Sequence, residues 1–425
     1  MRNIIFRTLR LGLVLHLFLT AMPAFPSDLH LGMDLAGSYN SQTHYLDRGD
    51  WGLRDQFHFS KDRTFGHLSA APYCAVTLSK NISGFVQADL DWENPAETTT
   101  VDEAVVDWTK AFLSLSAGRA TLDLGLQTVS LGAGLVMADD VPAAAFEIKR
   151  NKTYLGLTLA QALDSSPMAA ATIGYRPGDF EHMELFGIWF RDRDNAFARA
   201  IPPIYQVLLD PGSDGDLYWA GVSAQLFVGR ALFTAMGAYQ WGAFRLYNGS
   251  IDSRHNVSAY CVDLSVEGNL SDWCSVGAFF YMASGDDTPL RNDLNAFVAV
   301  MPLNARADIF FDPEFLGREE TAETLTFAGG YIGGVLAPGL TINLIPWSDL
   351  MLETTVASFY AQQALDDGSR WYGWEIDLAL NYTFGKIYTL FAEAARFQHG
   401  DYFRSLLDET VDSATRVSIG LRASF

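Results

Sequence analysis

Apolar and polar residues alternate along much of the chain with a period of two. At the C-terminal end, Val417, Ile419, Leu421, Ala423 and Phe425 are apolar, and the residues between them are polar or small. The same period recurs in the ranges 29–38, 86–92, 122–127, 218–228, 336–344 and 372–382. A two-residue period places alternate side chains on opposite faces of a β-strand. The chain is therefore predicted to be all-β, with strands that have one apolar and one polar face.

The predicted strands are joined by short and long connections that alternate along the chain. The short connections lie near Asn81–Ser83, Ala117–Gly118, Asn151–Lys152, Gly178, Gly229–Arg230, Gly268–Ser271, Trp347–Asp349 and Gly385–Lys386. The longer polar stretches are 41–65, 94–103, 131–143, 193–216, 244–255, 284–333 and 399–412. This arrangement predicts a transmembrane antiparallel up-and-down β-barrel of about 18 strands. The count includes three weakly alternating segments, Trp108–Ser116, His182–Phe190 and Phe310–Leu336.

A soluble β-sandwich also has alternating strands, but three features favour a barrel in a membrane. The apolar face is almost free of charge on many consecutive strands, and in the range 372–382 it is expected to include Tyr372, Trp374 and Leu378. The polar face carries repeated carboxylates, which a water-filled channel accommodates. Aromatic residues near the strand ends are expected to form interfacial girdles. They are Trp92, Trp241, Trp273, Tyr281, Trp371 and Tyr388.

The N-terminus has the pattern of a secretory signal peptide. Three arginines lie among the first ten residues, the apolar stretch Leu11–Ala21 follows, and small residues occur near Ala24 and Ser27. We expect a signal peptide of residues 1–24, cleaved between 24 and 27, and a single barrel domain of residues 25–425 with its largest loop at 284–333. Without those arginines, 26 basic residues stand against 50 acidic ones, so the net charge falls from −21 to −24. This acidic balance argues against nucleic acid as a partner.

Two internal stretches and the C-terminus resemble known outer-membrane proteins. The stretch AGRATLDLGLQTVSLGAGL (Ala117–Leu135) has a Gly-Arg that opens a strand leading to a Gly-rich loop, and YMASGDDTPLRNDLNAFVAVMPL (Tyr281–Leu303) has a Ser-Gly-Asp before a long loop. Both resemble the alginate-export family of outer-membrane porins. The resemblance implies a Gram-negative outer-membrane barrel and passive export or uptake of small or polymeric carbohydrate. The final strand, ending in Phe425, resembles the signal that the barrel assembly machinery reads.

Alternation also predicts which charged residues line the lumen. The alginate exporter is associated with an Arg-rich constriction, whereas the polar face here is mainly acidic. Carboxylate rings favour cations and Arg or Lys rings favour anions, so alginate is in doubt as the cargo. Arg119 could sit in the constriction or extend to lipid headgroups at the rim. The pore-lining candidates are Asp34, Asp89, Asp91, Asp123, Asp263, Glu353, Glu375, Asp377, Glu393, Arg119, Arg416 and Arg422.

Other motifs have simpler interpretations. The Asp-rich stretch Asp210–Trp219 lacks the spacing and the closing Glu of an EF-hand, so a solvated turn is favoured over a calcium site. Cys261 and Cys274 are predicted on opposite faces, which argues against a disulfide, and all three cysteines are expected to be free. The sequence contains no HExxH, no P-loop, no Gly-x-Ser-x-Gly and no paired-cysteine zinc signature.

These observations predict a passive outer-membrane channel, not an enzyme, that needs no cofactor. Its expected partners are outer-membrane lipid, the barrel assembly machinery, and a small polar solute or polysaccharide. Two alternatives remain open: an outer-membrane barrel enzyme, and an adhesin or structural barrel whose lumen is plugged.

Overall fold

The computed structural model describes most of the chain after the N-terminal region. The described residues are 28–47, 58–95, 105–163, 166–178, 180–193, 195–200, 212–248, 251–286, 293–300, 307–312, 315, 325–327, 333–365, 367–407 and 411–425. The predicted signal peptide lies outside these ranges and so stays a prediction.

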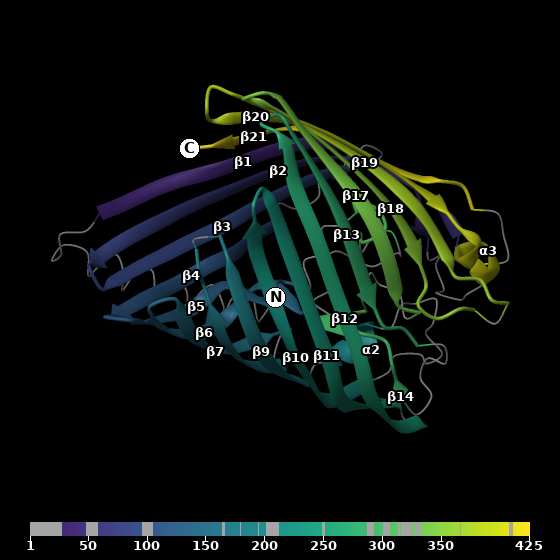
Figure 1. Cartoon of the computed structure of the whole chain (residues 1–425), viewed down its shortest axis with the longest axis horizontal. Coiled ribbons are helices and arrows are strands. Elements are labelled where there is room, and N and C mark those ends of the chain that lie inside the picture. The colour runs from purple at the N-terminus through teal and green to yellow at the C-terminus, as the bar shows by residue number, and fades with distance from the viewer. Residues whose placement is uncertain are drawn as a thin grey trace.

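Eighteen antiparallel strands form one closed barrel (Figure 1). Each strand pairs with the next along the chain, and β1 also pairs with β21, which closes the sheet. The strands are β1 (Asp28–Asp47), β2 (His58–Ser79), β3 (Ile82–Pro95), β4 (Val105–Ala117), β5 (Ala120–Leu131), β6 (Met137–Arg150), β7 (Thr153–Ala162), β8 (Ser166–Tyr175), β9 (His182–Asp192), β10 (Gly212–Val228), β11 (Ala231–Asn248), β12 (Ile251–Ser271), β13 (Cys274–Ala283), β17 (Val335–Trp347), β18 (Leu350–Tyr360), β19 (Trp371–Phe384), β20 (Tyr388–His399) and β21 (Ala414–Ser424). The predicted fold class and strand number are confirmed.

The remaining elements belong to the connections. The strands β14 (Asp293–Leu294), β15 (Val298–Val300) and β16 (Leu325–Phe327) lie between β13 and β17, and the short helices are α2 (Ala196–Ala200) and α3 (Asp401–Leu407). Both helices lie at the end of the barrel opposite the C-terminus (Figure 1). No helix within the described ranges is long and apolar enough to span a bilayer.

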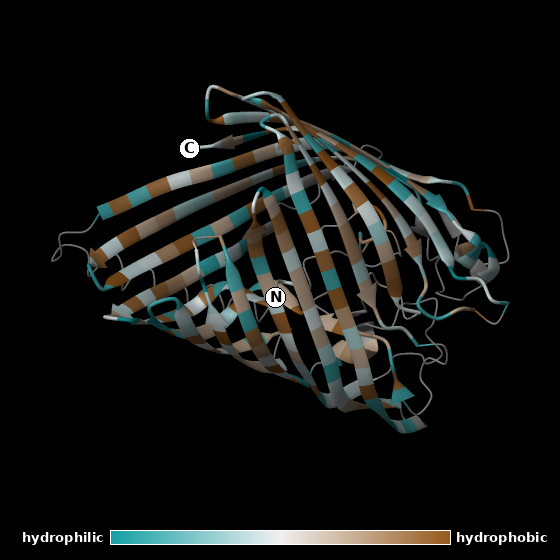
Figure 2. Ribbon diagram, viewed as in Figure 1, coloured by the Kyte–Doolittle hydropathy of each residue, from teal (hydrophilic) through white to brown (hydrophobic). Residues whose placement is uncertain are grey.

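The outward face of the barrel is apolar. Residues such as Leu157, Leu264 and Leu378 are exposed at alternate positions of their strands, and the hydropathy of the ribbon alternates along β1 and β12 (Figure 2). Tyr281 is an exception to the predicted girdles, because it is buried on the inward face with Ala283. The outward face thus presents the hydrocarbon-compatible surface that a lipid-facing barrel needs.

Two predicted boundaries are wrong. The turn after β12 is at residues 272–273, because β12 continues through Gly268–Ser271. The predicted long stretches at 131–143 and 244–255 are mostly strand, since β6 starts at Met137 and β11 and β12 extend through the second stretch. Polar composition marks a loop poorly here, because polar residues also face the inside of a barrel.

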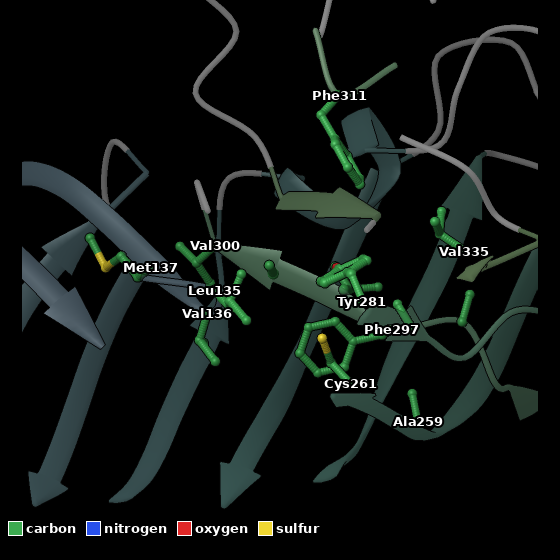
Figure 3. Close-up of a cluster of buried hydrophobic side chains, with 14 of the residues drawn as sticks. Leu135, Val136, Met137, Ala259, Cys261, Tyr281, Phe297, Val300, Phe311 and Val335 are labelled. Atoms are coloured by element: carbon green, nitrogen blue, oxygen red, sulfur yellow. The ribbon is translucent and has the colours of Figure 1, made fainter. Parts of the chain in front are cut away.

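The connection between β13 and β17 folds into the barrel. We call its described residues the inward segment: 284–286, 293–300, 307–312, 315, 325–327 and 333–334. Phe310 and Phe311, which the sequence had placed in a weakly alternating strand, lie in this segment and are buried. Figure 3 shows Phe297, Val300 and Phe311 gathered with Tyr281 and Cys261 of the wall. The barrel interior, not lipid, covers these apolar side chains.

Candidate pore lining

The inward face of the barrel carries most of the predicted pore-lining residues. On β19, Glu375 and Asp377 are buried, whereas the outward-facing Leu378 between their strand neighbours is 49% exposed. The same parity places eleven of the twelve candidates on the inward face: Asp34, Asp89, Asp91, Asp123, Asp263, Glu353, Glu375, Asp377, Glu393, Arg416 and Arg422. Arg119 differs, because it occupies the exposed turn between β4 and β5.

Six carboxylates cover the inward face from β12 to β20. We call them the acidic wall: Asp263, Glu267, Glu353, Glu375, Asp377 and Glu393. Strand register brings distant parts of the chain into line here, because Glu267 pairs with Gly277 and Thr355 pairs with Asp377. One row of paired positions runs through Glu267, Gly277, Thr341, Thr355, Asp377, Ala395, Arg416 and Gln42. Residues more than a hundred positions apart in sequence therefore share one level of the lumen.

Glu375 holds the inward segment through its two carboxylate oxygens. The backbone N–H of Ile309 donates to Oε1 at 2.7 Å, and the backbone N–H of Phe310 donates to Oε2 at 2.9 Å. The Glu375 side chain is fully buried. Hydrogen bonds to an ionised group are stronger than those between neutral groups. This carboxylate thus acts as an anchor for the segment rather than as an open part of the wall.

A second anchor joins the segment to β1 and β21. Arg416 Nη1 lies 3.4 Å from Asp312 Oδ2 and donates to the backbone oxygen of Asp308 at 3.3 Å. The hydroxyl of Tyr45 donates to the same Asp312 oxygen at 3.3 Å. Asp312 is almost fully buried, so its charge depends on these donors.

The opposite side of the barrel also binds the segment. The N–H of Val300 donates to the carbonyl of Val136 at 2.7 Å, and the indole N–H of Trp219 donates to the carbonyl of Val298 at 3.1 Å. The N–H of Val298 donates to Gln240 Oε1 at 2.9 Å. The segment is therefore tied to both sides and crosses the lumen between them.

Aromatic packing closes the space around Phe310. Its ring stacks on Phe359 at 3.9 Å between centroids and contacts Tyr372 at 5.5 Å. Tyr372 faces inward, although alternation predicted it on the outer face with Trp374. The reason is a bulge: Phe359 pairs with Gly373 and the next residue pairs with Trp371, which leaves Tyr372 as the extra residue.

The two arginines on the inward face of β12 to β21 are both engaged. Arg422 lies 3.5 Å from Glu393 and over the ring of Phe391 at 4.1 Å, while Arg416 pairs with Asp312. Within the described residues, six carboxylates of the acidic wall thus face two paired guanidinium groups. The electrostatic balance of this side of the lumen is negative.

The other wall has a more even balance. Glu147 lies 2.7 Å from Lys149 and 3.3 Å from Arg176. Glu184 accepts hydrogen bonds from the Tyr154 hydroxyl at 2.7 Å and from Ser223 at 3.0 Å. Excess negative charge is therefore concentrated on the acidic wall.

Sequence reasoning missed several of these residues. Glu267 shares the face of Asp263, so the same two-residue period contained the signal for it. Asp308 and Asp312 carried no such signal, because they lie in a connection without period. Asp216 was predicted in a solvated turn, but it lies on β10 and accepts a hydrogen bond from Trp189 at 3.0 Å.

The cysteine prediction holds, and no metal centre is evident in the described ranges. Cys74, Cys261 and Cys274 are free, with Cys261 buried. Across the described residues, no group of three or more His, Cys, Asp or Glu side chains could hold a metal ion.

Comparison with solved structures finds similar barrels. OccK11 (OpdR) of Pseudomonas aeruginosa has a TM-score of 0.55 at 12% identity, over 94% of this chain and 96% of that one. The outer membrane protein opdK from Pseudomonas aeruginosa has a TM-score of 0.53 at 11% identity, over 93% and 99%. A structure of Pseudomonas aeruginosa OpdK with vanillate has a TM-score of 0.54 at 10% identity, over 93% and 99%.

No family model matches the chain, and no curated protein matches it. The resemblance to the alginate-export family therefore stays a prediction. At these low identities, the structural likeness shows that the chain shares the fold of outer-membrane barrels such as opdK.

Proposed function

We propose that this chain is a passive outer-membrane channel for small polar solutes that are neutral or positively charged. The observation that carries the proposal is the combination of an apolar outward face with an acidic, polar inward face on a closed barrel. A lipid-facing belt and a hydrated lumen are what a porin requires. Glu267 and Arg422 are exposed on the inward face, which supports a lumen that water enters.

Outer-membrane location follows from the same features. Phe425 is 53% exposed at the end of β21, its ring packs edge-on against Tyr388, and its N–H donates to the carbonyl of Met33 at 3.0 Å. We propose that this terminal strand is the one read by the barrel assembly machinery, after removal of the predicted signal peptide. The lipid contact would be made by the apolar outward face.

Alginate is the less favoured cargo. Alginate is polyanionic, and the acidic wall would repel a polyanion on one side of the lumen. The same argument applies to a carboxylate such as vanillate, which the similar OpdK structure contains. The identity of the solute and the direction of flow are not fixed by this reasoning, and a neutral carbohydrate fits it as well as a cation does.

A plugged barrel is the second candidate, because the inward segment is hydrogen-bonded to both walls. A narrowed channel and a sealed barrel differ in one measurable property, which is ion conductance. Purified protein should be reconstituted into planar bilayers, with heat-modifiable gel mobility to confirm that the barrel is folded. Stepwise conductance supports the channel, whereas folded protein that inserts without conductance supports a plugged structural barrel.

A further inference from the structure

The acidic wall contains buried hydrogen-bond acceptors that the protein leaves without donors. Asp377 is 8% exposed, and its Oδ1 has no hydrogen-bond partner. On the neighbouring β17, Asn343 Oδ1 is also buried without a partner. A buried polar atom without a partner costs free energy, so such atoms indicate a missing water, ion or ligand.

The orientation of Asn343 explains why its oxygen is left over. Its amide Nδ2 donates to Glu267 Oε1 at 3.2 Å, and Ser275 donates to the same oxygen at 2.7 Å. The Asn343 donor is thus committed to the acidic wall, and its acceptor remains. Asn343 pairs in register with Glu353, which lies one inward position from Thr355, the partner of Asp377. The two unpartnered oxygens therefore flank the half-buried carboxylate of Glu353.

The described basic side chains nearby do not supply the missing donors. Arg416 is directed to Asp312 and to the backbone oxygen of Asp308, and Arg422 is directed to Glu393. What remains is a set of acceptors and negative charges spread over β12, β17, β18 and β19. Their chemical complement is a positively charged group that carries several N–H donors.

We propose that the acidic wall is a binding subsite for a small organic cation with amino or guanidino groups. Glu353 and Asp377 supply the charge, and Asn343 Oδ1 accepts one of the N–H groups of the solute. A bare metal ion is a poorer complement, because no described group of three acidic, His or Cys side chains is arranged to hold one. An organic cation spans wider spacings, since its donors are spread over several atoms. The inference rests on the proposed channel function and deepens it to a substrate class.

The test is binding of agmatine, which carries one amino and one guanidino group, to the folded barrel in detergent micelles by isothermal titration calorimetry. Saturable binding is expected for the wild type, with affinity reduced at least tenfold in Glu353→Gln and in Asp377→Asn. The control is Asp272→Asn, which removes one carboxylate from the exposed turn between β12 and β13 and should bind as the wild type does. Glutarate, a dicarboxylate of similar size, should not bind.

Each outcome bears on the inference. Glu353→Gln alters a half-buried residue, so it gives an answer even where Asp377→Asn fails to show heat-modifiable mobility. Absence of saturable agmatine binding would overturn the subsite and leave water as the partner of the two oxygens. Equal affinity in all three variants would also overturn it, because binding would lie elsewhere. Conductance without agmatine binding refutes the subsite alone, whereas agmatine binding by a barrel that does not conduct supports the subsite and refutes the channel.

Discussion

Glu375→Ala should release the inward segment and raise conductance through the barrel. The substitution removes both acceptors of the Ile309 and Phe310 N–H groups, which lie at 2.7 and 2.9 Å. Alanine also leaves these two donors buried with no replacement nearby. The segment would then be held mainly by the Arg416–Asp312 contact and by its hydrogen bonds to the opposite wall.

The size of the effect follows from the two bonds. Hydrogen bonds to charged groups contribute about 1.5–3 kcal/mol each, so the pair contributes about 3–6 kcal/mol to the anchored state. The buried carboxylate lies two residues from Asp377 on the same face, and the loss of like-charge repulsion offsets part of this. At the lower end, about 3 kcal/mol shifts the equilibrium between anchored and released segment by roughly a hundredfold.

The assay is single-channel conductance in planar bilayers, with heat-modifiable mobility as the test of folding. Glu393→Ala is the matched control, because it removes a carboxylate from the adjacent strand β20 that pairs with Arg422. Both variants make the lumen less negative, so both should shift ion selectivity in the same direction. Only Glu375→Ala should enlarge the conductance. Folded Glu375→Ala with the conductance of the wild type would refute the anchoring role of this carboxylate.

Two further predictions concern strand parity and the second anchor. Leu378→Lys places a charge on the outward face and should destabilise the barrel by about 2–4 kcal/mol, whereas Glu353→Lys on the inward face should leave assembly intact and reduce cation preference; comparable heat-modifiable mobility and urea stability in the two variants would contradict the assigned faces. Arg416→Met removes a donor from the nearly buried Asp312 and should cost about 1–3 kcal/mol in unfolding free energy, discounted for the partial exposure of Arg416. The control is Arg422→Met, whose partner Glu393 is more exposed, and an equal loss in both would argue against the Asp312 anchor.

The barrel could be predicted because its signal is local. A strand period of two is visible in any ten residues, and the alternation of short and long connections follows from an up-and-down path. The boundaries failed where polar residues stay in strands, as in β6 and β12. Tyr372 failed for a different reason, since one extra residue in a bulge reverses the face of its neighbours. A bulge leaves no mark in the alternation until the pairing partner is known.

The candidate site was predicted as a list of wall residues but not as a constellation. Parity identified Asp263, Glu353 and Asp377, yet it gave no information on which strands share a level of the lumen. The inward segment could not be predicted, because its position depends on tertiary contacts such as Glu375 to Phe310. Those contacts turn Glu375 from an expected lining residue into an anchor. Arg291 and Arg306, which an inward-folding loop could carry into the lumen, lie outside the described residues.

The central claim is that an acidic lumen conducts ions with a preference for cations. The most direct test is the reversal potential of the wild-type channel in a planar bilayer under a KCl gradient, measured at low and at high salt. The acidic wall predicts a cation-selective potential that weakens as salt screens the carboxylates. An anion-selective potential that persists at low salt would contradict the account and return an acidic polysaccharide to consideration as the cargo.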